Sequence, residues 1–514
     1  MGSLPSGLTA RRGLQCALVR RASLALLAAV VALSGAPLAS CGQHDATAPG
    51  PAADASSDAT PAPVLRTDPN AVHVIGTTFR DTQGRQLLFR GYNAKTAPLF
   101  DVTFTDGRVP QQTFPDLTEA QAARVEQLGF NVLRIALNWS SLEPQPLQYS
   151  AAWMQSLDGV LAMAHRHAFY VILDMHQDAY SKEIGLDGQP LWAIVPPPTQ
   201  LMQGPFDGSS TTSGQVLNAG FSFFDDALAT DGRDLQGAYV AAVQQMVQHV
   251  LGDPAVLGYE AYNEPVVLHQ DLLDAFHQTF AAGVHAIDAD APVLFEPVST
   301  RNETDDAVIP STPWSSGPGA YAVHIYTGVF SMSGAWSAQN EDPSILAPSM
   351  AHAELERAGW GTPMFVTEYG CDQTQPQGPV WISDELDLQD QYLVSSTLWQ
   401  LAETGTWGLY DGNGDERPAT VRIVSRTFPR AVAGDLLGIA RPAPGDMIVT
   451  YRPTARTIGL PHEVSLSTAY VTAPAITCDG QPVAFTQLTG RATFVCPVSD
   501  TSNHVFEVRG TPAP

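Results

Sequence analysis

Positive charge is scarce in this sequence. Its 514 residues contain 26 Lys and Arg, only two of them lysines, against 52 Asp and Glu, for a formal net charge of −26. The first 40 residues hold four arginines and no acid, so residues 41–514 carry 22 basic and 52 acidic groups, a net charge of −30. A chain this acidic repels a phosphate backbone, and we therefore expect no nucleic-acid partner.

The composition excludes other classes of protein. Charged residues make up only 15% of the chain and hydrophobic ones 44%, which excludes a disordered acidic tail. The 42 glycines and 40 prolines follow no fixed period, which excludes collagen, and we find no internal repeat. The length fits two to four domains, or one large barrel with a smaller module.

The N-terminus has the pattern of an export signal. Four arginines precede an apolar run at residues 24–33, which is too short to span a bilayer. Leu38-Ala39-Ser40-Cys41 resembles the bacterial lipobox, in which the cysteine is acylated after cleavage. The alternative is an ordinary secretory signal with an incidental cysteine. We predict a lipoprotein signal over residues 1–40 and a product exported from a bacterial cell, lipid-anchored through Cys41 to a membrane or secreted.

A tether is expected after the signal. Residues 45–63 are mainly Ala, Pro, Ser, Asp and Thr, with almost no large apolar side chain. Such a segment cannot bury enough surface to offset the entropy lost on ordering. We therefore predict a disordered tether over residues 41–69.

Cysteine is also scarce. Of the five cysteines, Cys16 leaves with the signal and Cys41 is the lipidation candidate. Cys478 and Cys496 lie in neighbouring strand-like segments and could pair in an oxidising compartment, which would leave Cys371 as a buried free thiol. Sequence alone leaves this pairing open.

Residues 70–417 alternate short β-rich runs with amphipathic stretches, the pattern of parallel strands joined by helices. Eight such units predict a (β/α)₈ TIM barrel with a long insertion at residues 177–233. The expected strands are residues 86–91, 131–137, 169–175, 256–262, 292–296, 321–325, 364–367 and 397–401. The expected helices are residues 118–128, which open with a capping box, 151–167, 234–251, 272–287, 345–358 and 385–395.

Helical periodicity disappears after Pro418. Short alternating segments follow, which predicts a small C-terminal β-sandwich domain over residues 418–514. The expected strands are residues 447–451, 464–467, 483–486, 492–495 and 504–508.

Two glutamates end barrel strands. One strand runs into Asn263-Glu264-Pro265 and another into Glu368-Tyr369-Gly370. Their separation of 104 residues is about three strand–helix units of roughly 35 residues, which assigns them to strands four and seven. Reacting groups of such barrels lie at the carboxyl ends of strands, so we expect both carboxylates to face one mouth.

Polar and aromatic residues also end other strands: Arg134, His176, His324, Tyr326 and Trp399. Each has a structural explanation when taken singly. Asn-Glu-Pro is a common helix start, a lone histidine is more often a core residue, and a lone arginine is more often part of a structural ion pair. Their joint placement at successive strand ends favours catalysis.

With these residues the chain resembles glycoside hydrolase family 5, within the clan A retaining β-glycosidases, over about residues 72–415. Further motifs are similar to the endoglycoceramidase-related branch of that family: Phe89-Arg90-Gly91-Tyr92-Asn93, Asp174-Met175-His176-Gln177-Asp178 and Val323-His324-Ile325-Tyr326. The C-terminal domain, which begins near residues 428–434, is similar to that branch as well.

The resemblance implies a role for each carboxyl group. Glu368 is the expected nucleophile and Glu264 the acid/base, about 5 to 5.5 Å apart as in retaining enzymes. Arg134 and Tyr326 are expected to keep Glu368 ionised, whereas Glu264 needs a raised pKa to donate a proton near neutrality.

The remaining residues are expected to bind the sugar. The resemblance assigns the sugar 2-hydroxyl to Asn263, the same subsite to His176 and His324, and a flat apolar face to Trp399. Gln177 and Asp178 are candidate sugar contacts. Asp174 could orient His176 or merely close its strand, and Lys95, just past strand one, could lie at the surface or contact substrate. We expect no cofactor and no metal, because the histidines show no ligand spacing.

Three functions compete. The first is an exported, lipid-anchored, monomeric retaining β-glycosidase that acts on a β-linked glycolipid or a similar amphiphilic glycoside. The second is a β-glucanase or mannanase that cuts polysaccharide, and the third is a catalytically silent sugar-binding lipoprotein. The third requires loss of one carboxylate, yet Glu264 and Glu368 are both present. Apolar residues of the insertion, including Trp192, Phe223 and Phe224, favour the first, unless they form a folded lid.

Overall fold

The computed structural model describes residues 64–110, 112–202, 213–305, 309–329 and 341–513. The predicted signal, Cys41 and most of the predicted tether lie outside these residues. In the described part of the chain, no helix is long and apolar enough to cross a membrane. The end of the predicted tether, residues 64–69, is not disordered: the Arg66 guanidinium pairs with Asp288 at 2.9 Å and donates to the carbonyl of Val256, which fixes this segment to the barrel.

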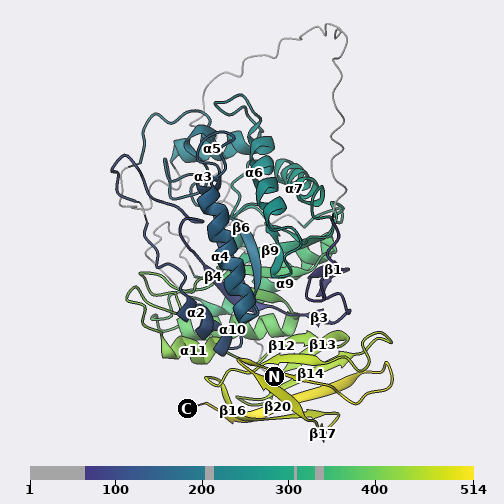
Figure 1. Cartoon of the computed structure of the whole chain (residues 1–514). Helices are drawn as coiled ribbons and strands as arrows, with labels where there is room; N and C mark the ends of the chain where they lie inside the picture. The colour runs from purple at the N-terminus through teal and green to yellow at the C-terminus, as the bar shows by residue number, and fades with distance from the viewer. Residues whose placement is uncertain (1–63, 111, 203–212, 306–308, 330–340, 514) are drawn as a thin grey trace, which may run out of the picture. The chain divides into compact units, whose positions relative to one another are not determined.

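Eight parallel strands close into a barrel, which confirms the predicted fold class (Figure 1). Their faces are almost wholly buried, as expected for strands covered by helices on one side and by the barrel interior on the other. In barrel order they are β4 (Arg90–Ala94), β5 (Val132–Leu137), β6 (Tyr170–Met175), β7 (Val256–Glu260), β8 (Val293–Phe295), β9 (Gly319–Ile325), β10 (Met364–Tyr369) and β11 (Ser395–Leu398).

Helices connect the strands, and the expected ones are all present, although the one expected over residues 385–395 begins seven residues earlier, at Gly378. The capping box of α2 is formed, because Thr118 accepts from the Gln121 N–H and Gln121 accepts from the Thr118 N–H. The helices are α2 (Glu119–Gln127), α3 (Trp139–Leu142), α4 (Ala151–His167), α5 (Gly214–Phe224), α6 (Leu235–His249), α7 (Gln270–His285), α8 (Arg301–Thr304), α9 (Leu346–Trp360), α10 (Gly378–Tyr392) and α11 (Pro418–Val424), with 3-10 turns η1 (Leu191–Ala193) and η2 (Pro343–Ile345).

The first predicted strand, residues 86–91, is divided between two sheets. Gln86–Leu87 forms β3, which pairs antiparallel with β2 (Thr78–Arg80) and with β12 (Pro429–Val432), and the barrel strand begins only at Arg90. A tight turn joins β2 to β3, in which the Asp81 carboxylate accepts from two backbone N–H groups and from the Arg85 side chain.

Two antiparallel sheets make up the second half of the fold. One has the order β1-β2-β3-β12-β15-β19-β18 and the other β13-β14-β20-β16-β17, and side chains of both share one core. The additional strands are β1 (His73–Ile75), β13 (Asp435–Ala440), β14 (Met447–Arg452), β15 (His462–Ser465), β16 (Val471–Cys478), β17 (Gln481–Pro482), β18 (Phe485–Leu488), β19 (Arg491–Phe494) and β20 (His504–Pro512).

The predicted domain limits therefore need correction. Three strands from residues 73–87 belong to the sheet that we expected to come from residues 418–514 alone. The segment after Pro418 also begins with helix α11, which packs against α10 of the barrel. Cys478 and Cys496 form a disulfide in the sandwich core, the pairing that the sequence left open. Cys371 is a buried free thiol.

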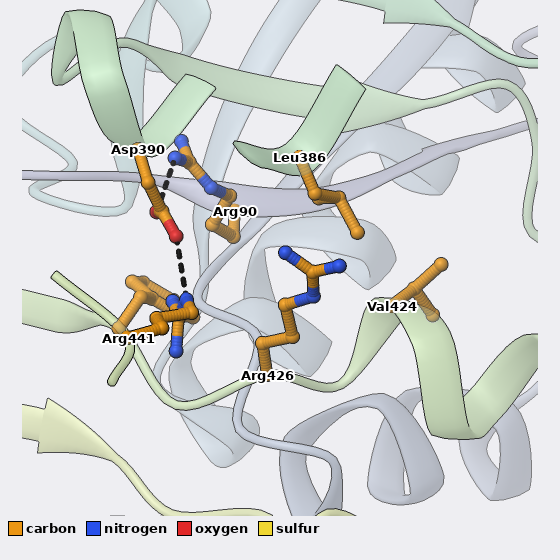
Figure 2. Close-up of a pocket in the computed structure, with 7 residues that line it drawn as sticks. Arg90, Leu386, Asp390, Val424, Arg426 and Arg441 are labelled. Carbon is orange, nitrogen blue, oxygen red and sulfur yellow. Dashed lines mark hydrogen bonds and ion pairs between the residues drawn. The ribbon is translucent and has the colours of Figure 1, made fainter. Parts of the chain in front are cut away.

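An ion-pair cluster joins the barrel to the sandwich. Asp390 of α10 accepts from Arg441 Nε at 2.7 Å and lies 3.5 Å from Arg90 Nη2 (Figure 2). Arg90 begins barrel strand β4, whereas Arg441 directly follows β13. The cluster thus connects the amino-terminal side of the barrel to the sandwich. It lies on the side opposite the mouth formed by the carboxyl ends of the strands.

Candidate active site

Arg134 lies at the centre of the barrel mouth. Its fully buried guanidinium donates to Glu260 at 2.6 Å, to Asn263 at 2.9 Å and to Glu368 at 2.5 Å. It also donates to Asn93 at 2.9 Å and lies 3.1 Å from the Asp174 carboxylate. A single arginine therefore organises the ends of several strands.

Glu368, in β10, is held at both oxygens. Arg134 Nη1 donates to Oε1, and the Tyr326 hydroxyl donates to Oε2 at 2.7 Å. Burial raises the pKa of Glu368 above its ordinary value, although the neighbouring His324 and Arg134 act to lower it. We expected the partners of Glu368 to keep it ionised; they are in contact with it, but desolvation outweighs them and the net shift is upward.

Glu264 lies four residues after the end of β7 and has a different environment. Its Oε1 accepts from Asn302 Nδ2 at 3.0 Å and lies 2.9 Å from His324 Nδ1, and its side chain keeps 28% exposure against 5% for Glu368. Burial, strengthened by the negative charge of Asp178, raises the pKa of Glu264 to about 7. The backbone of Glu264 has φ +45°, a strained conformation that is typical of functional sites.

The two carboxylates are close to each other. One oxygen of Glu264, one oxygen of Glu368 and a ring nitrogen of His324 all lie within 4.8 Å of one another. Retaining glycosidases have carboxyl groups about 5 to 5.5 Å apart, whereas inverting ones need about 6.5 to 9.5 Å to admit a water molecule. The observed proximity agrees with the retaining arrangement.

His176 and Trp399 form one wall of the site. Their rings are stacked with centroids 5.6 Å apart and planes 9° apart, and Trp399 keeps part of its surface exposed. Asp174 orients His176, since Asp174 Oδ2 lies 2.7 Å from His176 Nδ1. Burial lowers the pKa of His176, but Asp174 outweighs it and raises that pKa well above its ordinary value. Asp174 therefore does more than close its strand.

Gln177 and Asn263 bind each other's backbone. Gln177 Nε2 donates to the carbonyls of Asn263 and Glu264, its Oε1 accepts from the Tyr180 N–H, and Asn263 Nδ2 donates to the Gln177 carbonyl. The buried Gln177 amide thus has protein partners at both its nitrogen and its oxygen, and its contact with sugar stays a prediction. Asn263 retains the second hydrogen of its amide for a sugar hydroxyl.

Asp178 and Lys95 both lie at the mouth. Asp178 Oδ2 is 3.6 Å from His176 Nε2, and its side chain is partly exposed. Lys95 is buried, with its ammonium 4.8 Å from the Trp399 ring centroid and 4.3 Å from that of Phe100. The surface alternative for Lys95 is therefore wrong.

Sequence reasoning missed three residues beside the carboxylates. Glu296 ends the predicted fifth strand, and Glu260 ends β7, so the rule of strand ends could have identified both. Asn302 lies in α8, within a crossover that carries no clear helical pattern, and nothing in the sequence marks it.

Two groups of side chains in the described residues come close enough to one another to hold a metal ion: Glu260, Glu296 and His324, and Glu264, His324 and Glu368. The first group already has a cation, because Arg134 lies 2.6 Å from Glu260 and 3.6 Å from Glu296. The second group contains both candidate catalytic carboxylates. That the site needs no metal and no cofactor stays a prediction.

The insertion beyond β6 forms a folded wall. Trp192, Ile194, Phe223 and Phe224 are buried in the main core, so these side chains do not form an exposed apolar patch. The exposed apolar side chains nearest to Glu264 in the sequence are instead Val266 at 42% and Leu268 at 39%, in a segment approached by Gly220 of α5.

Comparisons with known proteins agree with this geometry. The family model of cellulase, glycosyl hydrolase family 5, matches residues 92–405. Endoglycoceramidase I of Rhodococcus hoagii (strain 103S) is 27% identical over 461 residues, which cover 83% of this chain and 84% of that protein. A glucosylceramidase of Aspergillus fumigatus is 26% identical over 243 residues, 38% of this chain and 32% of that protein. The structure of endo-glycoceramidase II from Rhodococcus sp. in complex with ganglioside GM3 superposes with a TM-score of 0.69 at 21% identity, over 85% of this chain and all (100%) of that chain.

Proposed function

The chain belongs to the cellulase family, glycosyl hydrolase family 5, and from this premise we propose that it is a retaining β-glycosidase acting on the sugar of a glycolipid or a similar amphiphilic glycoside. The predicted resemblance to the family and to endoglycoceramidases is confirmed, and the chain is a glycoside hydrolase. The observation that carries the proposal is the proximity of one carboxylate oxygen of Glu264, one of Glu368 and a ring nitrogen of His324, which all lie within 4.8 Å of one another.

The first chemical step forms a glycosyl-enzyme. Glu368 attacks the anomeric carbon while Glu264 gives its proton to the leaving oxygen, and the bond between that carbon and that oxygen breaks. Arg134 and Tyr326 each donate to a different Glu368 oxygen, which aims the carboxylate at one position. A pKa of about 7 allows Glu264 to be protonated at the start of this step near neutral pH.

The second step hydrolyses the intermediate. Glu264, now ionised, removes a proton from water as the water oxygen attacks the anomeric carbon and Glu368 departs. Asn263 uses its remaining amide hydrogen for the sugar 2-hydroxyl, and the exposed face of Trp399 contacts the sugar ring. Two glutamates thereby serve two roles because their surroundings differ.

Two observations support an amphiphilic substrate. An endoglycoceramidase and a glucosylceramidase are similar to this chain in sequence, and one structure of the same fold is a complex with a ganglioside. The segment after Glu264 also exposes Val266 and Leu268, which suit contact with an apolar aglycone.

A hydrolysis panel tests this substrate class. Glucosylceramide, lactosylceramide, a ganglioside and a steryl glucoside are compared with carboxymethyl-cellulose at equal enzyme concentration. We expect cleavage of at least one glycolipid and none of the cellulose derivative. Preferential cleavage of carboxymethyl-cellulose would instead establish the polysaccharide alternative.

We further propose that the protein is exported and lipid-anchored through Cys41. The lipobox-like Leu38-Ala39-Ser40-Cys41 supports the anchor. The Cys478–Cys496 disulfide supports residence in an oxidising compartment, since such bonds are rare in reducing cytoplasm.

A further inference from the structure

Glu296 is a third glutamate of the mouth, which the mechanism above does not use. It directly follows β8 and is almost completely buried. Its Oε2 accepts from the backbone N–H of Glu264 at 3.1 Å and lies 3.4 Å from His324 Nε2. Glu296 therefore contacts Glu264, the candidate acid/base, and also His324, whose other ring nitrogen contacts Glu264.

The charges around Glu296 do not balance if every carboxyl group is ionised. Facing it are Arg134 from β5, Asp174 from β6, Glu260 and Glu264 from the end of β7, and His324 from β9. Arg134 lies within 3.1 Å of Glu368, Glu260 and Asp174, but 3.6 Å from Glu296, the longest of its four contacts with carboxylates. Ionisation of a buried carboxyl group is strongly disfavoured when its nearest cation already pairs at shorter distance with three other carboxylates.

Resting on the proposed function, we propose that Glu296 is a neutral carboxylic acid that positions Glu264. One oxygen, Oε2, performs two tasks: it accepts from the Glu264 N–H, and its own O–H donates to His324 Nε2. Burial and the negative charge of Glu260 raise the pKa of Glu296 well above its ordinary value, in the direction that this arrangement requires.

The proton on Glu296 determines which nitrogen of His324 carries hydrogen. Burial lowers the pKa of His324 to about 4, so the ring is neutral and has one N–H. If Nε2 accepts from Glu296, the hydrogen is on Nδ1, 2.9 Å from Glu264 Oε1.

The consequence concerns the two oxygens of Glu264. Oε1 accepts from both His324 Nδ1 and Asn302 Nδ2, which assigns the transferable proton to the other oxygen, Oε2. The Glu296 contact with the Glu264 N–H also holds the backbone at its φ of +45°. Glu296 is thus a positioning residue that selects the proton-carrying oxygen of the acid/base.

Glu296→Gln separates a neutral Glu296 from an ionised one. The amide oxygen still accepts from the Glu264 N–H, but it cannot donate to His324 Nε2, so the histidine hydrogen moves to Nε2. Nδ1 then accepts from protonated Glu264, which raises the pKa of Glu264. The alkaline limb of the kcat/KM profile should move up by roughly one pH unit. The rate on a poor leaving group should fall about tenfold, with little change on an activated aryl glycoside.

An ionised Glu296 gives the opposite result. Glu296→Gln would then remove a negative charge near Glu264 and lower the pKa of that residue, so the alkaline limb would move down. A downward shift, or an unchanged profile, overturns the proposal. Glu385→Gln is the matched control, because Glu385 is also fully buried but lies on α10 and bonds Gln389; its profile should match the wild type.

Infrared spectroscopy of the unchanged enzyme tests the proton directly and needs no variant to fold. At pH 9 Glu264 and Glu385, with pKa values of about 7, are ionised and give no carboxylic acid C=O band. The neutral Glu296 should still give such a band at this pH. The band should be absent in Glu296→Gln and present in Glu385→Gln. Its absence from the wild-type spectrum overturns the proposal.

Glu264→Ala and Glu368→Ala are measured in parallel. Wild-type hydrolysis by both would contradict the proposed function, whatever the infrared result. Loss of hydrolysis in both, together with a downward or absent shift in Glu296→Gln, would contradict only the role of Glu296.

Discussion

Arg134 donates from Nη1 to Oε1 of Glu368 at 2.5 Å, and both side chains are buried at the centre of the barrel mouth. The same guanidinium also pairs with Glu260 and Asp174. Orientation of the proposed nucleophile and compensation of buried charge are therefore tasks of one residue.

Replacing this arginine should damage both stability and catalysis. Arg134→Met leaves several buried carboxylates without their cation, and we expect a loss of about 3 to 5 kcal/mol in the free energy of unfolding. Activity at a temperature where the variant is folded should fall at least about a hundredfold. Chemical denaturation and steady-state kinetics measure the two effects. Arg166→Met, which breaks only an exposed pair with Glu119, is the control and should change neither.

The barrel and its two carboxylates could be predicted from the sequence, because strand-end positions follow from a simple alternation. Glu368 lies near the end of the largely apolar strand β10, Glu264 lies four residues after the end of β7, and parallel strands all end at the same mouth. Arg134, His176, His324 and Tyr326 were found by the same rule and do meet in the structure.

What escaped prediction depends on contacts distant in sequence. β3 pairs with β12, more than 340 residues later in the chain, so no local pattern could reveal that residues 73–87 join the C-terminal sheet. Nothing local shows that the Gln177 amide bonds the backbone of Asn263, 86 residues later in the chain. Asn302 donates to Glu264 from the short helix α8, whose buried Arg301 donates to Glu356, more than 50 residues later in the chain.

The proposed lipid anchor makes a separate prediction. Cys41→Ala removes the only thiol that the lipobox-like motif offers for acylation, so the protein should move from the membrane fraction to the soluble one. Detergent phase partitioning of the two forms, expressed in bacteria, measures this. Cys371→Ala, which alters a buried free thiol, is the control and should partition like the wild type. Membrane retention of Cys41→Ala would show that this cysteine is incidental.

The pH dependence should follow Glu264. Formation of the glycosyl-enzyme requires protonated Glu264, so kcat/KM should decline above pH 7, where its pKa of about 7 lies. The negative charge of Asp178 helps to raise that pKa, and Asp178→Asn should therefore move the alkaline limb to lower pH, by roughly half to one unit.

The pH at which the alkaline limb of the kcat/KM profile falls is the decisive measurement. The maximum of kcat/KM is not, because Asp178 also lies near His176 and its replacement can lower activity in another way. Asp446→Asn removes an acid in the sandwich, just before β14, and should leave the limb in place. An upward movement in Asp178→Asn would mean that this carboxylate does not raise the pKa of Glu264.

The last prediction separates the roles of the two glutamates. Glu264→Ala should recover much of its glycosylation rate on activated aryl glycosides, because a good leaving group needs little help from an acid. Glu368→Ala should not respond to the leaving group in this way, since it cannot form the covalent intermediate, but added azide can occupy the space of the missing carboxylate. Azide that intercepts the glycosyl-enzyme of Glu264→Ala gives a product with retained anomeric configuration. Azide that replaces Glu368 attacks the substrate itself and gives the inverted product. Proton NMR of the glycosyl azides distinguishes these outcomes: the opposite pair of anomers would exchange the two roles, and unchanged activity in both variants would mean that the chemistry takes place elsewhere.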